Sequence, residues 1–383
     1  TMIHIGIIGG GPVGLATAEA LLERFSGKEA KITLLECSVE TRATFKAAAA
    51  FWTPFCTGTN EDVSAELSLD SLEYYLGVVN NPGYEPKDTG LVVRKLEMHF
   101  LENTIKNIPC WAMRRRLETQ TRPNGDDYIN HNINDNAFGT GRTRCEFSYK
   151  TPVICVDKFV PWLKSRLESI GLKVKQVDCA FSQASNKAWE QATQEQDILV
   201  WCMGAQTIET GITGPDYPHE GAYQPKKGVV AHIPKMPKPD DPVVLFEGGR
   251  FDSHTLYMVP TVDNFVLGGT VFSVDINAGD NAWTSTQDEI EGILSRAEIF
   301  LPGFYKEVVR EYKERLESNP GMWRVGVRPM LSAGPIYRQS PKKLLGKQSF
   351  LHYGHGGSGF TFCHFTAKKI VALIDNYLVD SCA

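Results

Sequence analysis

The stretch IHIGIIGGGPVGLATAEALLERF, residues 3–25, decides the fold of this chain. Its first six residues form an apolar run that predicts a buried strand, and its Ala- and Leu-rich second half predicts a helix. Between the two, the spacing G-x-G-x-x-G places three glycines, Gly9, Gly11 and Gly14. In that order they permit a tight turn, a close approach of a pyrophosphate to the backbone, and close packing of the helix on the strand.

A second strand, predicted at residues 31–35, ends in an acid, Glu36. A carboxylate at this point of a βαβ unit accepts a hydrogen bond from a ribose 2′-hydroxyl and repels a 2′-phosphate. Pro12 and Val13 complete the glycine turn, and free N–H groups at the start of the helix favour phosphate oxygens. We therefore expect an adenine dinucleotide to bind at this N-terminal unit.

A fingerprint of this kind does not by itself distinguish NAD from FAD. The chain leaves the regular βαβ pattern after Glu36, and a second apolar strand runs into a glycine turn only at residues 196–205. A glycine-rich loop at residues 354–359 then precedes a helix predicted at residues 360–379. Three separated segments that converge on one cofactor suit the extended FAD. The helix dipole would also stabilise negative charge on a reduced flavin ring.

Size, composition and charge exclude several classes of protein. The 383 residues, of which 42% are hydrophobic, are enough for two domains with cores of their own. A net charge of −5 with mixed signs makes nucleic acid and anionic membranes poor partners, and no apolar run is long enough for a transmembrane span. Because the first strand begins at residue 3, we expect no signal peptide. The nine scattered cysteines, none in a C-x-x-C pair, favour reduced thiols inside the cell.

The rest of the chain predicts a mixture of helices and strands. The expected helices lie at 64–79, 157–170, 285–301 and 304–316, and the expected strands at 91–94, 228–233, 255–259, 264–272 and 350–353. The polar residues 122–144 predict a surface loop. The alanine run at 47–50 is open to two interpretations, a short helix or a small-residue surface on which a flat ligand rests.

A pair of histidines, His352 and His355, has the spacing H-x-x-H, with Cys363 and His364 nearby. Such a group could suggest zinc. A strand followed by a loop does not hold two imidazoles on one face, however, and no carboxylate accompanies them, so we expect no metal site.

Four further segments follow the fingerprint in order. They are AAFWTPF at 49–55, YMVP at 257–260 with VLGGT at 266–270, GVRP at 326–329, and HYGHGGSGFT at 352–361. The first is similar to an A-G-L-W-x-P-Y segment, and the third to G-x-R-P. Together with the glycine turn, they make the chain resemble the D-amino acid oxidase family of FAD enzymes along nearly its full length.

The resemblance implies an α/β fold, in which a Rossmann-like FAD-binding domain is interleaved with a substrate domain on a mixed or antiparallel sheet. The FAD-binding domain would take residues 1–50, 151–210 and 320–383. The substrate domain would take residues 51–150 and 211–319, with a lid near 248–255.

The same resemblance implies the residues of the site. Arg328 and Tyr257 would hold a substrate carboxylate, since the planar fork of arginine matches a carboxylate and a tyrosine hydroxyl adds a neutral donor. The carbonyl of Gly357 would receive the substrate amine. FAD would be bound without a covalent link, because residues 330–333 contain no cysteine. The residues expected to contact FAD are Gly9, Gly11, Pro12, Val13, Gly14, Glu36, Ala49, Ala50, Phe51, Val177, Gly204, Gly356, Gly357, Ser358, Gly359, Phe360 and Thr361.

The activity implied is oxidative deamination of a D-amino acid by hydride transfer from Cα to flavin N5. The imino acid would hydrolyse to a 2-oxo acid and ammonia, and O₂ would be reduced to hydrogen peroxide. In D-aspartate oxidases, which the chain also resembles, two arginines and a histidine suit an acidic side chain. This chain has one of the three, Arg250, because Val271 occupies the position of the second arginine and Phe55 lies near that of the histidine. We therefore expect a neutral, apolar or aromatic D-amino acid as the substrate.

Three alternatives stay open from the sequence. They are a D-aspartate oxidase, a related amine or imine-forming oxidase acting on glycine, sarcosine or a specialised amine, and a flavin-binding protein without turnover. The expected partners are a small amino acid and O₂, and homodimer formation is left open. The C-terminal residues 381–383, SCA, differ from the peroxisomal signal S-K-L. The expected location is therefore intracellular, cytoplasmic or peroxisomal, without a convincing peroxisomal signal.

Overall fold

The computed structural model of the chain describes residues 2–25, 29–38, 42–54, 57, 61–100, 120–121, 144–179, 186–209, 223–247, 255–275 and 281–382. The expected surface loop at 122–144 lies outside these residues apart from Arg144. The expected lid lies outside them apart from Thr255, and so do Arg250 and Phe55.

In the described part of the chain, a six-stranded sheet follows the order β14-β15-β7-β1-β2-β6. Its strands are β1 (Ile3–Ile8), β2 (Ala30–Cys37), β6 (Lys173–Val177), β7 (Ile198–Trp201), β14 (Ile336–Gln339) and β15 (Gln348–Tyr353). All neighbours pair in parallel except β14 with β15. The buried part of the central strand β1, residues 5–8, is apolar, as expected for a sheet that is covered on both faces.

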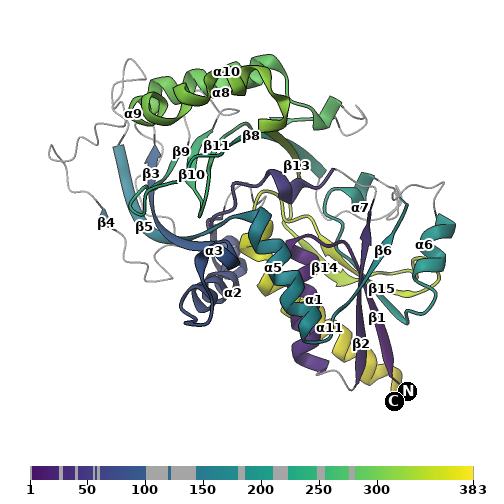
Figure 1. Ribbon diagram of the computed structural model, residues 1–383. Helices are drawn as coiled ribbons and strands as arrows, with labels where there is room; N and C mark the ends of the chain where they lie inside the picture. Colours follow the sequence, from purple (N-terminus) through teal and green to yellow (C-terminus); the bar gives the residue numbers. More distant parts are fainter. Residues whose placement is uncertain are drawn as a thin grey trace.

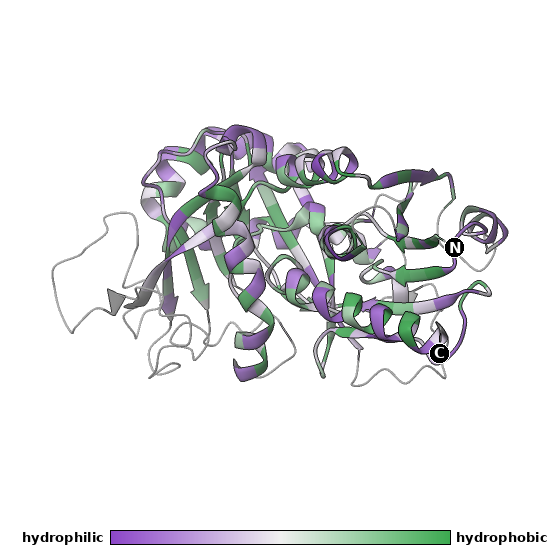
Figure 2. Cartoon of the chain, turned by 90° about the horizontal axis from the view of Figure 1, so that it is seen from below, coloured by the Kyte–Doolittle hydropathy of each residue, from purple (hydrophilic) through white to green (hydrophobic). Residues whose placement is uncertain are grey.

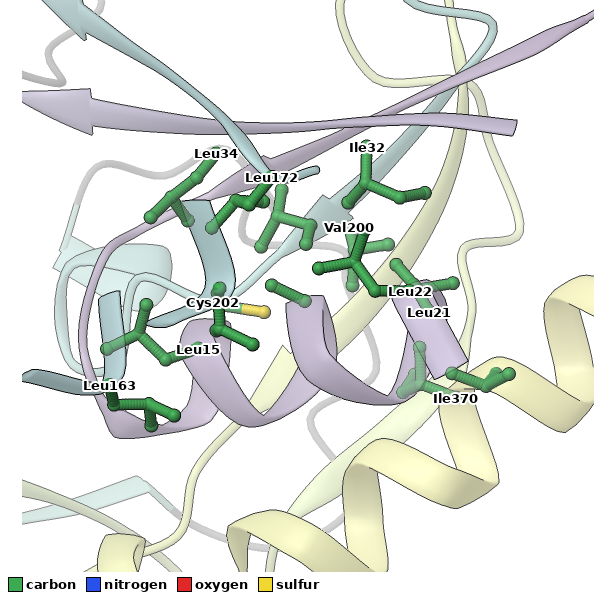
Figure 3. Close-up of a cluster of buried hydrophobic side chains, with 14 of the residues drawn as sticks. Leu15, Leu21, Leu22, Ile32, Leu34, Leu163, Leu172, Val200, Cys202 and Ile370 are labelled. Carbon is green, nitrogen blue, oxygen red and sulfur yellow. The ribbon is translucent and has the colours of Figure 1, made fainter. Parts of the chain in front are cut away.

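One face of this sheet is covered by α1 (Pro12–Phe25), α5 (Val156–Ser169) and α11 (Gly359–Cys382), as Figures 1 and 3 show. Leu15, Leu21, Leu163 and Ile370 from these helices pack on Ile32 and its neighbours in the strands. The helix α2 (Glu61–Val79) lies against α11, and α6 (Asn186–Ala192) covers the opposite face of the sheet. This arrangement of helices on a parallel sheet confirms the predicted Rossmann-like unit.

The second sheet has nine strands among the described residues and is mixed. Its order is β12-β8-β11-β10-β9-β3-β5-β4. Outside this order, β13 also pairs with β8 along its length. The strands are β3 (Leu91–Phe100), β4 (Gln120–Thr121), β5 (Arg144–Ile154), β8 (Tyr223–Ile233), β9 (Val243–Glu247), β10 (Leu256–Pro260), β11 (Phe265–Gly268), β12 (Phe272–Ser273) and β13 (Trp323–Leu331). Only β3 and β9 pair in parallel within this described sheet, so the predicted mixed or antiparallel sheet is confirmed.

Helices cover one face of this second sheet, along the top of Figure 1. They are α8 (Gln287–Phe300), α9 (Pro302–Phe304), a π-helical turn (Tyr305–Val309) and α10 (Arg310–Ser318). The strands alternate, so that Met258 and Phe246 point to these helices while Tyr257 and Leu245 point to the opposite face. Figure 2 shows the same organisation, with apolar strands inside and helices striped by apolar and polar faces.

The remaining described elements are short connections. They are η1 (Thr44–Ala47), α3 (Pro86–Thr89), α7 (Gln206–Glu209) and η5 (Pro320–Met322). Of the alanine run, Ala47 ends a 3₁₀ turn and residues 48–50 continue as irregular chain, so the run does not form a continuous helix. The interpretation as a surface for a flat ligand stays a prediction. No helix in the described ranges is long and apolar enough to cross a bilayer.

The chain passes repeatedly between the two sheets, which confirms that they are interleaved. Residues 323–331, within the last segment expected for the FAD-binding domain, form β13 of the nine-stranded sheet. Their long antiparallel pairing with β8 explains this placement. It also brings a strand of the second sheet next to the loop that opens α11, since Met330 bridges to His355.

Candidate active site

The glycine turn between β1 and α1 has the geometry that its spacing predicts. Gly9 has φ +112°, and a Cβ atom there would lie 2.6 Å from the carbonyl oxygen of Cys202. A Cβ atom on Gly14 would overlap the carbonyl oxygen of Gly9. The first glycine therefore makes the turn next to β7, and the third allows the helix to pack directly on the turn.

Glu36, near the end of β2, lies in the cavity wall at the place where a carboxylate would face the ribose of a dinucleotide. Its Oε2 atom accepts hydrogen bonds from Nε2 of Gln176 at 2.6 Å and from Nζ of Lys164 on α5. Its Oε1 atom lies beside Gly10, where a Cβ atom would overlap it. Two neighbours thus hold one carboxylate oxygen, and the other oxygen faces the glycine turn.

A cavity of about 430 Å³ extends from this turn to the second sheet. On the side of the parallel sheet it is bounded by the carboxyl ends of β1, β2, β7 and β15, the place at which such sheets bind their ligands. On the other side its wall comes from η1, β8, β9, β10 and β13. The predicted site residues in its wall are Gly9, Gly11, Pro12, Val13, Glu36, Ala49, Ala50, Phe51, Gly204, Tyr257, Arg328, Gly356, Gly357, Gly359 and Phe360.

Four predicted contact residues do not lie in that wall. Gly14 packs under the turn, as described above. Val177 is buried among Ile8, Leu35 and Trp189 in the core of the parallel sheet, and its neighbour Gln176 lines the cavity instead.

Thr361 and Ser358 are the other two, and both are buried behind the wall. Thr361 donates a hydrogen bond to the carbonyl of Thr53 at 3.0 Å, and the backbone N–H of Ser358 donates to the carbonyl of His355 at 2.9 Å. Both residues brace the loop rather than form its surface.

Glycines make room for the side chains of Arg328 and Tyr257. A Cβ atom on Gly228 of β8 would lie 2.6 Å from Cζ of Arg328 on β13. Cβ atoms on Gly268 and Gly269 would lie 2.5 and 2.6 Å from ring and hydroxyl atoms of Tyr257. Nη1 of Arg328 donates to the carbonyl of Thr270 at 3.0 Å. Both side chains therefore lie over bare backbone on the cavity side of the second sheet.

The loop before α11 connects this pair to the cofactor end of the cavity. Gly354 and Gly356 have φ values of +83° and +57°, which glycine adopts readily. The N–H of Gly356 donates to the carbonyl of Pro329 at 3.2 Å, next to Arg328 in the chain. Gly357 follows in the cavity wall, near the start of a long helix.

The two histidines of the loop form a hydrogen-bonded chain with two threonines. His355 Nε2 lies 3.0 Å from Thr366 Oγ1, His352 Nε2 lies 2.7 Å from the same oxygen, and His352 Nδ1 lies 2.9 Å from Thr17 Oγ1. Burial lowers the pKa of His355 to about 3 and that of His352 well below its usual range. The neutral imidazoles thus link α1 to α11 through hydrogen bonds. In the described ranges, no group of three or more acidic, histidine or cysteine side chains is arranged to hold a metal ion.

Several wall residues were not predicted from the sequence, among them Gly228, Leu245, Gln176, His352 and His355. Gly228 had a weak signal, because it begins the strand predicted at 228–233 and a glycine in a strand often marks a close approach of another group. Leu245 and Gln176 had none, since each looks like an ordinary strand residue until the sheets are assembled.

The residues present fit FAD. The glycine turn brings the backbone of Gly9 and Gly11 into the cavity wall, Glu36 keeps an oxygen beside that turn, and small residues at 47–50 line the cavity toward Tyr257. An extended dinucleotide needs this sequence of surfaces, with its phosphates at the helix start and its flat ring against small side chains.

A cavity built in this way places the protein in the class that binds a dinucleotide at the carboxyl ends of a parallel sheet and closes the site with a second sheet. The family model described as FAD dependent oxidoreductase, DAO, matches residues 4–373, and the chain belongs to this family. The protein is therefore an FAD-dependent oxidoreductase, which confirms the predicted cofactor and the resemblance.

Individual relatives agree with this assignment. The chain is 24% identical to a D-amino-acid oxidase of Dictyostelium discoideum over 98% of this chain and 92% of that protein. It is also 24% identical to a D-amino-acid oxidase of Streptomyces coelicolor over 97% of this chain and 96% of that protein.

Solved structures share the fold. A glycine oxidase from Bacillus cereus has a TM-score of 0.64 at 16% identity and covers 98% of this chain and 95% of its own. An L-amino acid deaminase from Proteus vulgaris has a TM-score of 0.67 at 11% identity, covering 98% and 94%. These likenesses extend over both sheets.

Proposed function

We propose that the protein is an oxidase of D-amino acids with neutral side chains. The observation that carries the proposal is the placement of Arg328 and Tyr257 in the wall of the cavity that begins at the glycine turn. A guanidinium and a phenol hydroxyl in the wall of one cavity offer a carboxylate a charged fork and a neutral donor. The family relatives that are named D-amino-acid oxidases support the substrate class.

In this proposal, the side chains bind and orient the substrate. Arg328 and Tyr257 hold the carboxylate, and the carbonyl of Gly357 accepts a hydrogen bond from the amine, so that three points fix the chirality at Cα. FAD, when bound, supplies the acceptor for the hydride that leaves Cα. The net reaction converts the amino acid and O₂ to an imino acid and hydrogen peroxide, and water releases the 2-oxo acid and ammonia.

A neutral side chain is proposed because the wall next to Tyr257 is apolar. Leu245 pairs directly with Tyr257 across β9 and β10, and Phe51 packs on the same cluster. A second carboxylate there would lose water without gaining a charged partner from these two residues, which is costly. We also propose that FAD is held without a covalent bond, so that acid or heat should release it.

A panel of substrates tests the function. Purified holoenzyme is offered D- and L-forms of alanine, phenylalanine and aspartate, together with glycine and sarcosine, and peroxide release is followed. We expect turnover of the D-forms of alanine and phenylalanine, and much slower turnover of D-aspartate. Peroxide only from glycine or sarcosine would favour the amine-oxidase alternative, and turnover only of L-forms would refute the proposed chirality. A yellow protein that oxidises none of them would favour a binding protein without turnover.

A further inference from the structure

The side chain of Arg296, on α8 at the outer face of the second sheet, extends toward the site. Nη2 of Arg296 donates a hydrogen bond to the carbonyl of Gly269 at 3.2 Å. The helix itself is anchored, because Thr286 and Glu289 form a capping box and Glu289 pairs with the buried Lys227 of β8 at 2.8 Å. Arg296 therefore extends from a fixed base to the segment after β11.

Arg296 has an unusual environment for a guanidinium. Its Nε atom is buried and has no hydrogen-bond partner in the part of the chain that the structure describes. Burial alone lowers the pKa of the Arg296 side chain to about 10, still well above neutral pH. No ion pair with a carboxylate joins the half-buried Arg296 among the described residues, so partial burial of this cation costs free energy that a salt bridge does not offset.

Residues 268–270, which Arg296 contacts, support both Tyr257 and Arg328, the two residues proposed to bind the substrate carboxylate. Gly268 and Gly269 form the bare backbone against which the Tyr257 ring and hydroxyl lie. The next residue, Thr270, accepts a hydrogen bond from Arg328 through its carbonyl at 3.0 Å. The Thr270 hydroxyl accepts another from the N–H of Val229 at 3.0 Å, which ties the segment to β8.

We propose that Arg296 is a positioning residue for the substrate carboxylate, which acts by holding residues 268–270 so that Tyr257 and Arg328 converge on one point. The inference rests on the proposed function, since it assigns a role in the same carboxylate site. Arg296 is not among the described residues that line the cavity, so we expect it to act without touching the substrate. Removal of the Arg296 side chain should let residues 268–270 move and should separate Tyr257 from Arg328.

The test compares Arg296→Gln and Arg296→Lys with a matched control, Arg94→Gln. Arg94 is a buried arginine whose guanidinium, like that of Arg296, donates hydrogen bonds to backbone carbonyls. Its partners are Lys238 at 2.7 Å and Thr261 at 3.1 Å, at the other end of β10. The holoenzymes are titrated with benzoate, a flat carboxylate with no hydrogen to transfer, through the flavin absorbance. KM and kcat, the dissociation constant of FAD and the melting temperature are measured on the same preparations.

For Arg296→Gln we expect the dissociation constant of benzoate and the KM to rise about tenfold, as for loss of one charge-assisted hydrogen bond. Its kcat and its affinity for FAD should stay close to those of the wild type, and Arg296→Lys should be intermediate. Arg94→Gln should lower the melting temperature and leave benzoate binding unchanged.

Two outcomes would overturn the inference alone. Benzoate could bind Arg296→Gln as it binds the wild type while Arg328→Ala fails to bind it, or Arg94→Gln could weaken benzoate as much as Arg296→Gln does. A wild-type holoenzyme that binds no benzoate and oxidises no amino acid would instead refute the proposed function, and the inference with it.

Discussion

At the scale of single residues, the site depends on where charge is placed and what it faces. Arg328 lies in the cavity wall on the open backbone of Gly228, with one N–H already directed to Thr270. The planar fork of a guanidinium carries five donors and matches the two oxygens of a carboxylate. The hydrogen bond to Thr270 orients the Arg328 side chain before a substrate carboxylate binds to it.

The first prediction concerns this arginine. Arg328→Ala should weaken apparent substrate binding by about 3–5 kcal/mol, since it leaves a carboxylate unpaired in a partly buried site. Arg328→Lys should keep the charge but lose the fork, and should give a smaller defect. KM values and benzoate titration measure both effects, while flavin content per protein should remain that of the wild type. Normal benzoate binding by the alanine variant, accompanied by loss of FAD, would make Arg328 a structural residue.

At the scale of elements, the join between β1 and α1 is a tightly constrained contact. The helix approaches the turn so closely that Gly14 touches the carbonyl of Gly9, while Gly9 itself lies against Cys202 at the end of β7. Strand, turn and helix therefore form one closely packed unit, and Gly11, Pro12 and Val13 at the helix start line the cavity.

The second prediction uses this contact. Gly14→Ala should destabilise the protein by about 1–3 kcal/mol and weaken FAD binding at least about tenfold, because the new methyl group forces helix and turn apart. Denaturant unfolding and titration of the apoprotein with FAD measure the two effects. The matched control is Gly77→Ala in α2, where a Cβ atom meets nothing within 4 Å. That change should stabilise the protein by about 0.5–1 kcal/mol. Equal behaviour of the two variants would contradict the close packing at Gly14.

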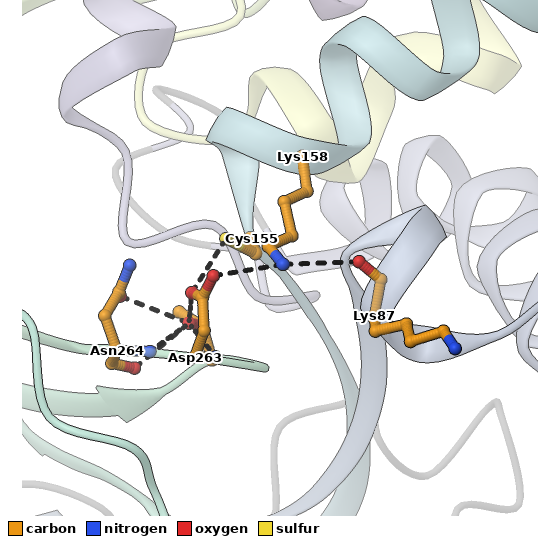
Figure 4. A network of polar contacts seen from close by, with 6 residues as sticks. Lys87, Cys155, Lys158, Asp263 and Asn264 are labelled. Atoms are coloured by element: carbon orange, nitrogen blue, oxygen red, sulfur yellow. Dashed lines mark hydrogen bonds and ion pairs between the residues drawn. The ribbon is translucent and has the colours of Figure 1, made fainter.

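At the scale of the whole molecule, polar contacts join the two sheets. Asp263, in the turn between β10 and β11, accepts a hydrogen bond from the Cys155 thiol at 3.5 Å and pairs with Lys158 of α5 at 3.2 Å (Figure 4). Lys158 also donates to the carbonyl of Lys87 in α3. The strand that carries Tyr257 is thus tied to the helices on the parallel sheet.

Buried histidines set how the stability of the whole molecule depends on pH. Burial lowers the pKa of His355 and His364 to about 3, and that of His232 to about 4. In the unfolded chain these groups take up protons near pH 6.5. Between about pH 6.5 and 4 the unfolded state therefore binds more protons than the folded state, and stability falls as the pH falls. Glu97, with its pKa lowered to about 2, adds a further loss below about pH 4.5.

The third prediction follows from that difference in bound protons. The free energy of unfolding of the holoenzyme, measured in denaturant, should decrease between pH 7 and pH 5, each buried histidine contributing up to about 1.4 kcal/mol per pH unit. His232→Leu, at a residue that is not among those lining the cavity, should reduce that slope by the share of one histidine. An unchanged stability from pH 7 to pH 5, or an unchanged slope in His232→Leu, would contradict the buried neutral state.

Much of this architecture is determined by local sequence. The glycine turn, Glu36 and the helices near 64–79 and 157–170 could be predicted because the backbone demands of a turn and the periodicity of a helix are encoded within a few residues. The motif resemblance added Arg328, Tyr257 and Gly357, and the structure places all three in one cavity wall.

Only the tertiary structure decided what lies next to what. The pairing of β13 with β8 places Arg328 over Gly228, the second sheet brings Leu245 beside Tyr257, and α8 supplies Arg296. Val177 was expected at FAD but is packed in the core, because which of two adjacent strand residues faces a cavity depends on how the sheet is covered. Contacts between residues far apart in the chain arise from strand register and from burial of apolar faces, and no short segment contains that information.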